Sequence, residues 1–301
     1  MILVVGDLIL DEVIKCNSNR ISPEAPVSVL LPIDKQHYLG GAANVANNVK
    51  KLGENILLIG IADFRGFESS KIIKKLLKKN LIKNKIFKSK TFVPPLKKRI
   101  FLGDKMICRL DYEKKVKNDQ MKKIYLYIKK NIKKFNLLII SDYNKGTVTK
   151  KIYINLVNLF KKNKKLIICN PKKNNISYYN GCDIIVPNEK EFHSFFKKKM
   201  KLTEKINYFF KKNNKIKNLI ITRGGKNLIF ASKEKINYFK VKKILPKDVT
   251  GASDTFISVL SVFLKNNYTI QDSIKKAIIG SGLIIKKNFT SYLKINEIRN
   301  R

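Results

Sequence analysis

The sequence is poor in the residues that build several common kinds of site. It has no tryptophan, only two histidines and only four cysteines in 301 residues. The cysteines are Cys16, Cys108, Cys169 and Cys182, and the histidines are His37 and His193. Because no two cysteines form a CxxC pair, neither a zinc cage nor a disulfide framework is expected. Neither histidine falls in a segment with an acid–base motif, so we expect neither to be catalytic.

Long apolar runs are also missing. Runs such as Leu137–Ile140 and Leu219–Ile221 are far shorter than the ~20 residues that a membrane-spanning helix needs. The first residues, MILVVGD, lack a basic leader and predict a buried strand rather than a signal peptide. We therefore expect a cytoplasmic protein with no membrane partner.

Acidic residues are scarce as well: 22 Asp and Glu face 64 Lys and Arg, which gives a formal net charge of +42. Such a charge can indicate a nucleic-acid-binding protein, and this alternative stays open. However, only seven of the 64 are arginines, and the lysines are scattered rather than gathered in a stripe with aromatic residues. Lys, Asn and Ile share A/T-rich codons, so coding bias at tolerant surface positions is the favoured interpretation. We expect no specific nucleic-acid partner, although a basic surface attracts phosphorylated small molecules.

Short apolar runs alternate with amphipathic stretches along the whole chain. The expected strands are Ile2–Gly6, Asn55–Gly60, Leu81–Lys88, Asn136–Ser141, Leu166–Cys169, Asp183–Val186, Leu219–Thr222, Leu228–Ala231 and Ile236–Val241. The expected helices are Gly41–Lys51, Glu68–Lys79, Asp119–Lys134, Thr147–Lys161, two that begin near Glu189 and Thr203, Ala252–Lys265 and Ile270–Lys286. This alternation predicts an α/β fold with a mostly parallel sheet covered on both faces.

Two segments, about 12–35 and 90–112, break the alternation. Both show strand-like patterns and prolines and lack a good helix pattern. They predict a small β-sheet that sits over the edge of the main sheet as a lid. Because a lid of this kind exposes strands, a homodimer formed through it is expected.

A first candidate site is the segment DVTGASDTF at 248–256. Gly251, Ala252 and Ser253 lead into a helix whose first N–H groups are unpaired, which favours binding of an anion. Asp254 would repel a phosphate, so it fits better as a base that takes a proton from an attacking hydroxyl. An ordinary Asp or Ser helix cap is the alternative.

Two further segments could hold a polyhydroxyl ligand. Gly40 and Gly41 open a helix that carries Asn44 on its first turn, where backbone amides and a side-chain amide could contact hydroxyls. Asp7 and Asp11 follow the first strand, at the sheet edge where open α/β sheets bind ligands. Tight helix–sheet packing and plain turn aspartates are the structural alternatives.

These segments resemble the ribokinase-like (PfkB) sugar kinases, which share a GG-containing helix start and a GAxD segment in this order. The likeness covers essentially the whole chain. It is greatest to the D-glycero-β-D-manno-heptose 7-phosphate kinases, through Arg20–Val27, Arg109–Glu113, Ser141–Gly146 and Asp248–Ala252. It implies a three-layer α/β/α fold with a small β-sheet lid, in a single domain over residues 1–301. In many bacteria this kinase is fused to a nucleotidyltransferase-like domain. The chain ends at Arg301, so we expect no such C-terminal domain.

The resemblance implies ATP-dependent phosphorylation of the anomeric hydroxyl of a heptose 7-phosphate. Asp254 would be the base, and the amides of Gly251, Ala252 and Ser253 would stabilise the transferring phosphoryl group. Sugar hydroxyls would contact Asp7, Asp11, Gly40, Gly41 and Asn44, and the 7-phosphate would contact Lys97, Arg99, Arg109 and Lys145. ATP would bind at Thr222, Gly224, Gly225 and Gly282. Mg²⁺ would be held through water by Asn188 and Glu191 of an NxxE pattern.

The sequence departs from the family pattern at a few positions. Ser253 stands where the family usually has glycine, and Asn227 ends the nucleotide turn where glycine is frequent. Prolines at 94 and 95 replace expected threonines near the lid. Another PfkB-family sugar or nucleoside kinase is the nearest alternative, and a panel of sugars would discriminate it.

Overall fold

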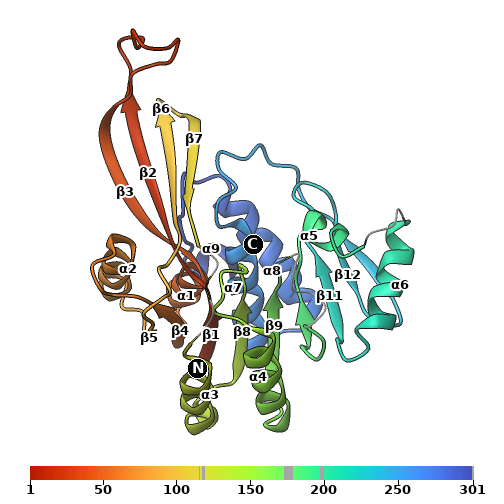
Figure 1. Ribbon diagram of the computed structural model, residues 1–301. Coiled ribbons are helices and arrows are strands. Elements are labelled where there is room, and N and C mark those ends of the chain that lie inside the picture. Colours follow the sequence, from red (N-terminus) through yellow and green to blue (C-terminus); the bar gives the residue numbers. More distant parts are fainter. Residues whose placement is uncertain (115, 117–118, 173–178, 197–199, 300–301) are drawn as a thin grey trace.

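The computed structural model describes residues 1–114, 116, 119–172, 179–196 and 200–299. Among these residues the strands form one nine-stranded sheet and one four-stranded sheet. Helices cover both faces of the larger sheet, so the predicted three-layer α/β/α fold with a separate small sheet is confirmed (Figure 1).

The larger sheet is parallel except at one edge. Its strand order is β13-β12-β11-β10-β9-β8-β1-β4-β5, and only β12 and β13 run antiparallel to their neighbours. The strands are β1 (Ile2–Gly6), β4 (Ile56–Ala62), β5 (Asn84–Lys88), β8 (Leu137–Ser141), β9 (Leu166–Asn170), β10 (Ile184–Ile185), β11 (Asn218–Ile221), β12 (Leu228–Ala231) and β13 (Ile236–Phe239). Because the parallel strands point the same way, the residues that follow them gather at one edge of the sheet.

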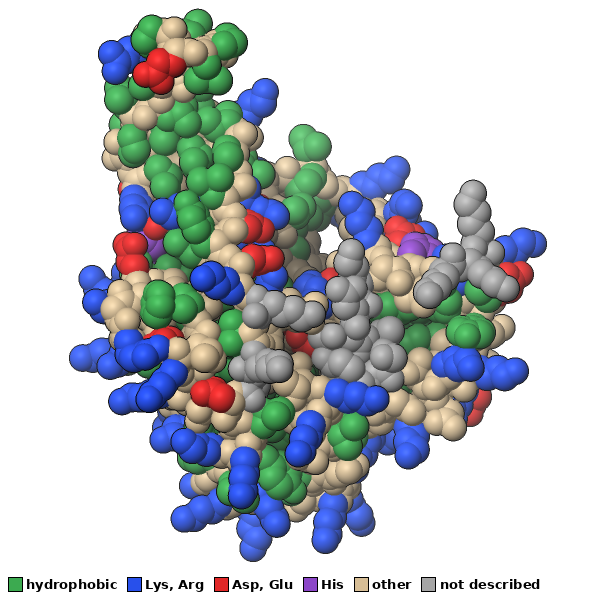
Figure 2. Space-filling model, viewed as in Figure 1, with side chains coloured by type: hydrophobic (Ala, Val, Ile, Leu, Met, Phe, Trp, Pro, Cys, Tyr) green, Lys and Arg blue, Asp and Glu red, His purple; other side chains and the backbone are tan. Residues whose placement is uncertain are grey.

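The lid is the four-stranded sheet, in the order β3-β2-β6-β7, and it rises from the body (Figure 1). Its strands are β2 (Leu8–Asn17), β3 (Leu31–Gly41), β6 (Leu96–Leu102) and β7 (Lys105–Tyr112). The lid therefore extends beyond the expected segments, since β2 begins directly after β1 and β3 runs into the helix start. Figure 2 shows that hydrophobic side chains cover much of its upper part.

Two layers of helices enclose the larger sheet. One layer contains α1 (Ala42–Lys51), α2 (Glu68–Lys79), α7 (Ala252–Lys265), α8 (Ile270–Ile284) and α9 (Asn296–Arg299). The other contains α3 (Met121–Lys130), α4 (Lys150–Lys162), α5 (Glu189–His193) and α6 (Leu202–Lys212). None of the helices in the described part of the chain has the length and apolar character that crossing a lipid bilayer requires.

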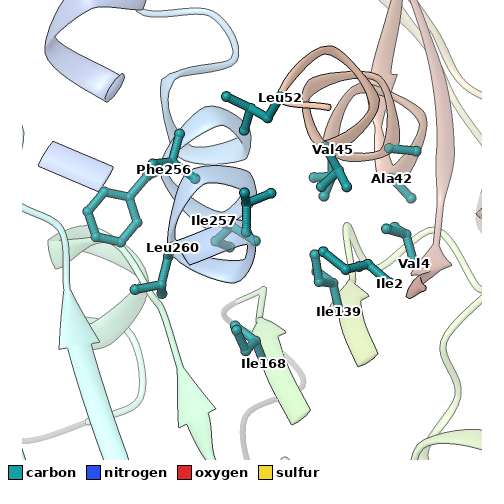
Figure 3. Packing of buried hydrophobic residues seen from close by; sticks show 14 of the residues in the cluster. Ile2, Val4, Ala42, Val45, Leu52, Ile139, Ile168, Phe256, Ile257 and Leu260 are labelled. Atoms are coloured by element: carbon teal, nitrogen blue, oxygen red, sulfur yellow. The ribbon is translucent and has the colours of Figure 1, made fainter. Parts of the chain in front are cut away.

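The core between the sheet and the first helix layer fixes where α1 and α7 begin. Ile2, Val4 and Ile139 of the sheet point toward Val45 of α1 and Ile257 of α7, and all five are fully or almost fully buried (Figure 3). Alternate residues of the same strands, such as Leu3 and Leu138, form the core with the second layer. Because both faces are buried, the strands are continuous apolar runs.

Most predicted elements are present, with differences at their ends. Strand β10 is only Ile184–Ile185, because Pro187 has no N–H to continue the ladder. Helix α4 begins at Lys150, since the Thr149 side chain caps it by accepting from the Ile152 N–H (3.3 Å). The expected helix over 119–134 ends at Lys130 and continues as a short 3-10 turn.

Candidate active site

The ends of the parallel strands bring polar residues together beside the start of α7. These residues are Asp7 after β1, Tyr143 after β8, Lys172 after β9, Asn188 after β10 and Thr222 after β11. Helix α7 packs against α1 and enters this edge with its N-terminus. A helix N-terminus at the carboxyl edge of a parallel sheet is a favourable place for an anion.

Asp254 lies on the first turn of α7 and is only 4% exposed. Its Oδ2 accepts a hydrogen bond from Asn44 Nδ2 (2.8 Å), and its Oδ1 accepts one from the Tyr143 hydroxyl (2.7 Å). The two donors lie more than 100 residues from Asp254 in the sequence. Each carboxylate oxygen keeps a second lone-pair site that an additional hydroxyl could use.

Burial is the largest influence on this carboxyl and raises the pKa of Asp254 to about 6. The hydrogen bonds from Tyr143 and Asn44 and the charge of Lys172 act in the opposite direction, and the charge of Asp11 raises the pKa. A carboxyl with a pKa near 6 is ionised at neutral pH, yet it is more basic than an ordinary aspartate. These are the properties of a general base.

The turn before α7 exposes backbone donors. Gly251 has the left-handed conformation (φ 78°), and a Cβ there would lie 3.0 Å from Asn44 Nδ2. The N–H groups of Gly251, Ser253 and Asp254 donate to no residue that the structure describes, whereas the Ala252 N–H is occupied by the Val249 carbonyl (3.2 Å). Of the three amides that the sequence suggested, those of Gly251 and Ser253 are available to an anion.

Asp7 has its oxygens committed to the backbone. Its carboxylate accepts from the N–H groups of Tyr143 (2.8 Å), Lys145 (3.1 Å) and Thr147 (2.9 Å), and the residue is fully buried. It therefore anchors the loop that carries Tyr143. The sequence suggested that Asp7 contacts sugar hydroxyls; in the structure its carboxylate is buried and accepts these three backbone hydrogen bonds.

The glycine pair lies where the lid joins α1. A Cβ on Gly40 would be 2.5 Å from Asp11 Oδ2, and one on Gly41 would be 2.5 Å from the Asp7 carbonyl oxygen. Gly41 also has φ 58°, which disfavours other residues. Glycine is thus required here by close packing of β2, and this packing places Asp11 beside the site, with Arg99 Nη1 2.6 Å from Asp11 Oδ1.

The cations suggested for the 7-phosphate all have acidic partners. Arg109 and Lys97 share Asp111 (2.9 and 3.6 Å), and Lys145 pairs with Glu113 (2.6 Å). Arg99 and Arg109 are direct cross-strand partners in the β6–β7 register, so they lie on the same face of the lid. We call this the inner face, because it also carries Asp11, whose charge acts on Asp254.

A cavity of about 510 Å³ opens on the other side of the α7 start. Ala252 and Ser253 line it together with Thr222, Gly224 and Gly225, and Gly282 of α8 lies in its wall. A Cβ on Gly224 or Gly225 would meet nothing within 4 Å, which leaves the backbone open to a ligand. The volume and mostly apolar lining suit a nucleoside.

Asn188 and Glu191 form a reciprocal capping box at the start of α5. Asn188 Oδ1 accepts from the Glu191 N–H (2.8 Å), and Glu191 Oε2 accepts from the Asn188 N–H (2.9 Å). Glu191 Oε1 also pairs with Lys172. No group of three or more His, Cys, Asp or Glu side chains that could hold a metal directly is found in the described ranges.

Sequence reasoning missed several polar residues here. Tyr143 and Lys172 were not singled out, although Tyr143 lies in the segment Ser141–Gly146 that carried part of the resemblance. Asn48 was missed too: its Nδ2 donates to Asn44 Oδ1 (3.0 Å), one helical turn away. The spacing of Asn44 and Asn48 was the available signal. Asn170 is 1% exposed, and its side-chain amide has no partner among the described residues.

Comparison with known proteins places this geometry in a family. Residues 1–293 match the pfkB family carbohydrate kinases. The chain belongs to the pfkB carbohydrate kinase family. Members of this family are ATP-dependent sugar kinases, usually with Mg²⁺, and the cavity beside α7 and the nearly buried Asp254 carboxyl are consistent with this activity.

The curated relatives that this chain matches are longer than the chain itself. It is 32% identical over 303 residues to the bifunctional protein HldE of Helicobacter pylori strain G27, and 31% identical over 311 residues to that of Haemophilus influenzae strain PittEE. Each match covers 99% of this chain but only 65% and 63%, respectively, of the relative.

Solved structures share the fold at low sequence identity. Phosphofructokinase-2 from Escherichia coli in complex with potassium has a TM-score of 0.79 at 13% identity, covering 100% of this chain and 97% of that one. Ribokinase from Thermotoga maritima has a TM-score of 0.71 at 17% identity, covering 99% and 95%. At these identities the likeness establishes the fold.

The cavity makes a first prediction at Gly282. A Cβ there would lie 3.2 Å from Ile244 Cδ1, so Gly282→Leu should fill part of the nucleoside space. We expect the KM for ATP to rise about tenfold, which corresponds to a loss of about 1.4 kcal/mol, with little change in the KM for the sugar. Lys275→Leu, at an exposed position of the same helix outside the cavity lining, is the control. An unchanged KM for ATP in Gly282→Leu would place the nucleotide elsewhere.

Proposed function

We propose that the protein phosphorylates the anomeric hydroxyl of a D-glycero-D-manno-heptose 7-phosphate, with ATP as donor. The product would be the 1,7-bisphosphate, on the route to ADP-heptose and lipopolysaccharide core. The observation that carries the chemistry is the Asp254 carboxylate, held by Asn44 and Tyr143 beside the free amides of the α7 start. The substrate assignment is supported by the 30–32% identity to HldE proteins of Helicobacter.

The proposed reaction is a direct transfer. The sugar oxygen attacks the γ-phosphorus of ATP, and the bond from that phosphorus to the ADP oxygen breaks. The hydroxyl proton passes to Asp254, and the N–H groups of Gly251 and Ser253 donate to the transferring phosphoryl group. The near burial of Asp254 limits access of water, which disfavours hydrolysis of ATP.

The inner face of the lid is suited to the second phosphate of such a substrate. Three cations, Lys97, Arg99 and Arg109, share two acids, Asp11 and Asp111, which leaves one positive charge in excess. Arg99 and Arg109 stand directly opposite each other, and like charges in that arrangement repel. A phosphate bound between them would relieve this repulsion, and arginine can bind a phosphate with two hydrogen bonds.

Asn188 and Glu191 fit a water-mediated role toward Mg²⁺, which takes oxygen ligands and keeps several of its own waters. Their oxygens can accept from metal-bound water while they retain the capping box, because each oxygen has two lone-pair sites. When bound, the ion would neutralise charge on the phosphate oxygens of ATP.

A panel of acceptors tests the proposed function. ADP release would be followed with heptose 7-phosphate, the unphosphorylated heptose, fructose 6-phosphate, ribose and a nucleoside. We expect the highest kcat/KM with heptose 7-phosphate. A preference for fructose 6-phosphate or a nucleoside would keep the kinase and reject the heptose assignment.

We further propose that two copies associate through their lids. Large apolar side chains are exposed on both lid segments: Ile21, Val27, Leu31, Ile33, Met106, Ile107, Leu110 and Tyr112. Strand β7 is exposed along its whole length and lies at the sheet edge, where an unpaired strand invites pairing (Figure 1). A second copy would cover this surface.

Leu110→Lys should therefore shift the protein from dimer to monomer in sedimentation velocity, since a lysine would have to be buried in the contact. Leu126→Lys, which changes another exposed leucine, on α3, is the control. If the wild type sediments as a monomer, or if both variants behave alike, the lid contact is wrong.

A further inference from the structure

One side chain at the base has no assigned role. The Tyr143 hydroxyl donates to Asp254 Oδ1, and no other hydrogen bond from a tyrosine hydroxyl reaches a residue of the α7 start within the described ranges. Asn44, which holds the other oxygen, was expected from the sequence to contact the sugar. Both carboxylate oxygens of Asp254 thus accept a side-chain hydrogen bond. Of the two donors, Tyr143 is the one that comes from the sheet edge, where it follows β8.

Tyr143 is itself held at its backbone and at its ring. Its backbone N–H donates to Asp7 Oδ2 (2.8 Å), and Lys145 and Thr147 of the same loop donate to the same carboxylate. The ammonium group of Lys172 lies 4.7 Å from the centre of the Tyr143 ring, within cation–π range. A loop with this many anchors holds the hydroxyl in one place, so the hydrogen bond to Asp254 is preorganised.

The charged groups around Asp254 come from four other segments of the chain. Asp11 of β2 carries a negative charge that is paired with Arg99 of β6, and Lys172 after β9 carries a positive charge that is paired with Glu191 of α5. Asp11 and Glu191 each have a cationic partner, and the largest influence on the pKa of Asp254 is its own burial. Burial opposes ionisation, and hydrogen-bond donors favour it.

Tyr143 is a donor at every working pH. Burial of its hydroxyl and the charges of Asp254, Asp11 and Glu191 raise the pKa of Tyr143 well above its ordinary value. The phenol therefore stays protonated and does not compete for the substrate proton. Of the causes that lower the pKa of Asp254, the hydrogen bond from Tyr143 is the largest.

We propose that Tyr143 is the positioning residue of the base: its hydroxyl orients the Asp254 carboxylate and keeps it ionised in a nearly buried site. This rests on the proposed role of Asp254. The sugar hydroxyl would donate to the remaining lone pair of Asp254 Oδ1 or Oδ2, and Tyr143 would keep its proton throughout the transfer. Loss of the hydroxyl of an ordinary core tyrosine would change stability alone, whereas loss of the Tyr143 hydroxyl would also change the pH at which Asp254 titrates.

Tyr143→Phe tests this directly, because it removes the hydroxyl and keeps the ring that the Lys172 ammonium contacts. The measurement is kcat against pH with both substrates saturating, which reports groups in the enzyme–substrate complex. In the wild type we expect kcat to fall below a pH of about 6. In the variant we expect this acidic limb of the kcat–pH profile to lie about one pH unit higher, because the ionised carboxylate loses a hydrogen bond. The second pKa of the substrate phosphate, near 6, is common to both enzymes and cancels in the comparison.

Tyr153→Phe is the matched control. Tyr153 is a fully buried tyrosine that donates to the backbone near Tyr179, on the far side of the sheet. We expect this variant to lower the melting temperature and to leave the limb in place. The proposal would be overturned if the acidic limb of the kcat–pH profile stayed in place in Tyr143→Phe. This holds whether kcat falls equally at every pH or stays unchanged. If Asp254→Asn kept normal turnover, the role of Asp254 itself would fail, so the two failures are distinguishable.

Discussion

Asp254→Asn should lower kcat by on the order of 10²–10⁴-fold, as expected when a general base is lost. The amide is isosteric and sits in the same pocket, but it cannot accept the hydroxyl proton. The cavity proposed for the nucleoside is lined by neighbours of Asp254 rather than by Asp254 itself, so we expect ATP to bind as before. Steady-state kinetics for turnover and calorimetry for ATP binding would measure the two effects separately.

Asp272→Asn is a closely matched control. Asp272 occupies the same position in the first turn of α8 as Asp254 does in α7, but it is exposed at the surface. Its removal should leave kcat unchanged, whereas a general effect of acidic residues at helix starts would alter both variants. Near-normal turnover in Asp254→Asn would remove Asp254 from the role of base.

Arg109→Met should raise the KM for heptose 7-phosphate about 10- to 100-fold, because hydrogen bonds to a charged group contribute about 1.5–3 kcal/mol. The kcat at saturation should change little, since the contact is remote from the transferring phosphoryl group. Asp111 keeps Lys97 as partner, so the substitution leaves no acid unpaired. The unphosphorylated heptose should lose nothing, because it has no phosphate to place.

Lys98→Met provides the comparison on the opposite face of the lid. Lys98 precedes Arg99 on β6 and pairs with Glu12, which keeps Lys35 and His37 as partners. Arg109→Met removes a cation from the inner face of the lid, and Lys98→Met removes one from the opposite face on the neighbouring strand. Equal kinetics in both, with unchanged affinity for the sugar phosphate, would reject the inner face as the phosphate site.

The fold could be predicted from the sequence because its signals are local. Apolar strands such as Ile2–Gly6 alternate with amphipathic helices such as Glu68–Lys79, and these two elements have the predicted bounds. The helix start at Gly251 could also be predicted, because a glycine and two small residues before an apolar helix are a local signal of an exposed helix N-terminus. The lid was predicted as two segments, although the sequence did not show that β3 runs on into α1.

The interior of the site could not be predicted in the same way. Asn44 and Asp254 are 210 residues apart, and nothing local in either segment indicates that they bond. Asp7 has the same surroundings in sequence as a ligand-binding aspartate, but its oxygens point at backbone amides of a distant loop. In a chain with this many lysines, the presence of a cation carries little information, so the partners of Arg99 and Lys145 required coordinates.

A crystal structure with a non-hydrolysable ATP analogue and heptose 7-phosphate would test the central claim most directly. We predict that the anomeric hydroxyl lies within about 2.6–3.2 Å of an Asp254 carboxylate oxygen. The γ-phosphate oxygens should accept from the N–H groups of Gly251 and Ser253. A sugar bound with that hydroxyl turned away from Asp254, or a nucleotide whose phosphates avoid the start of α7, would contradict the account.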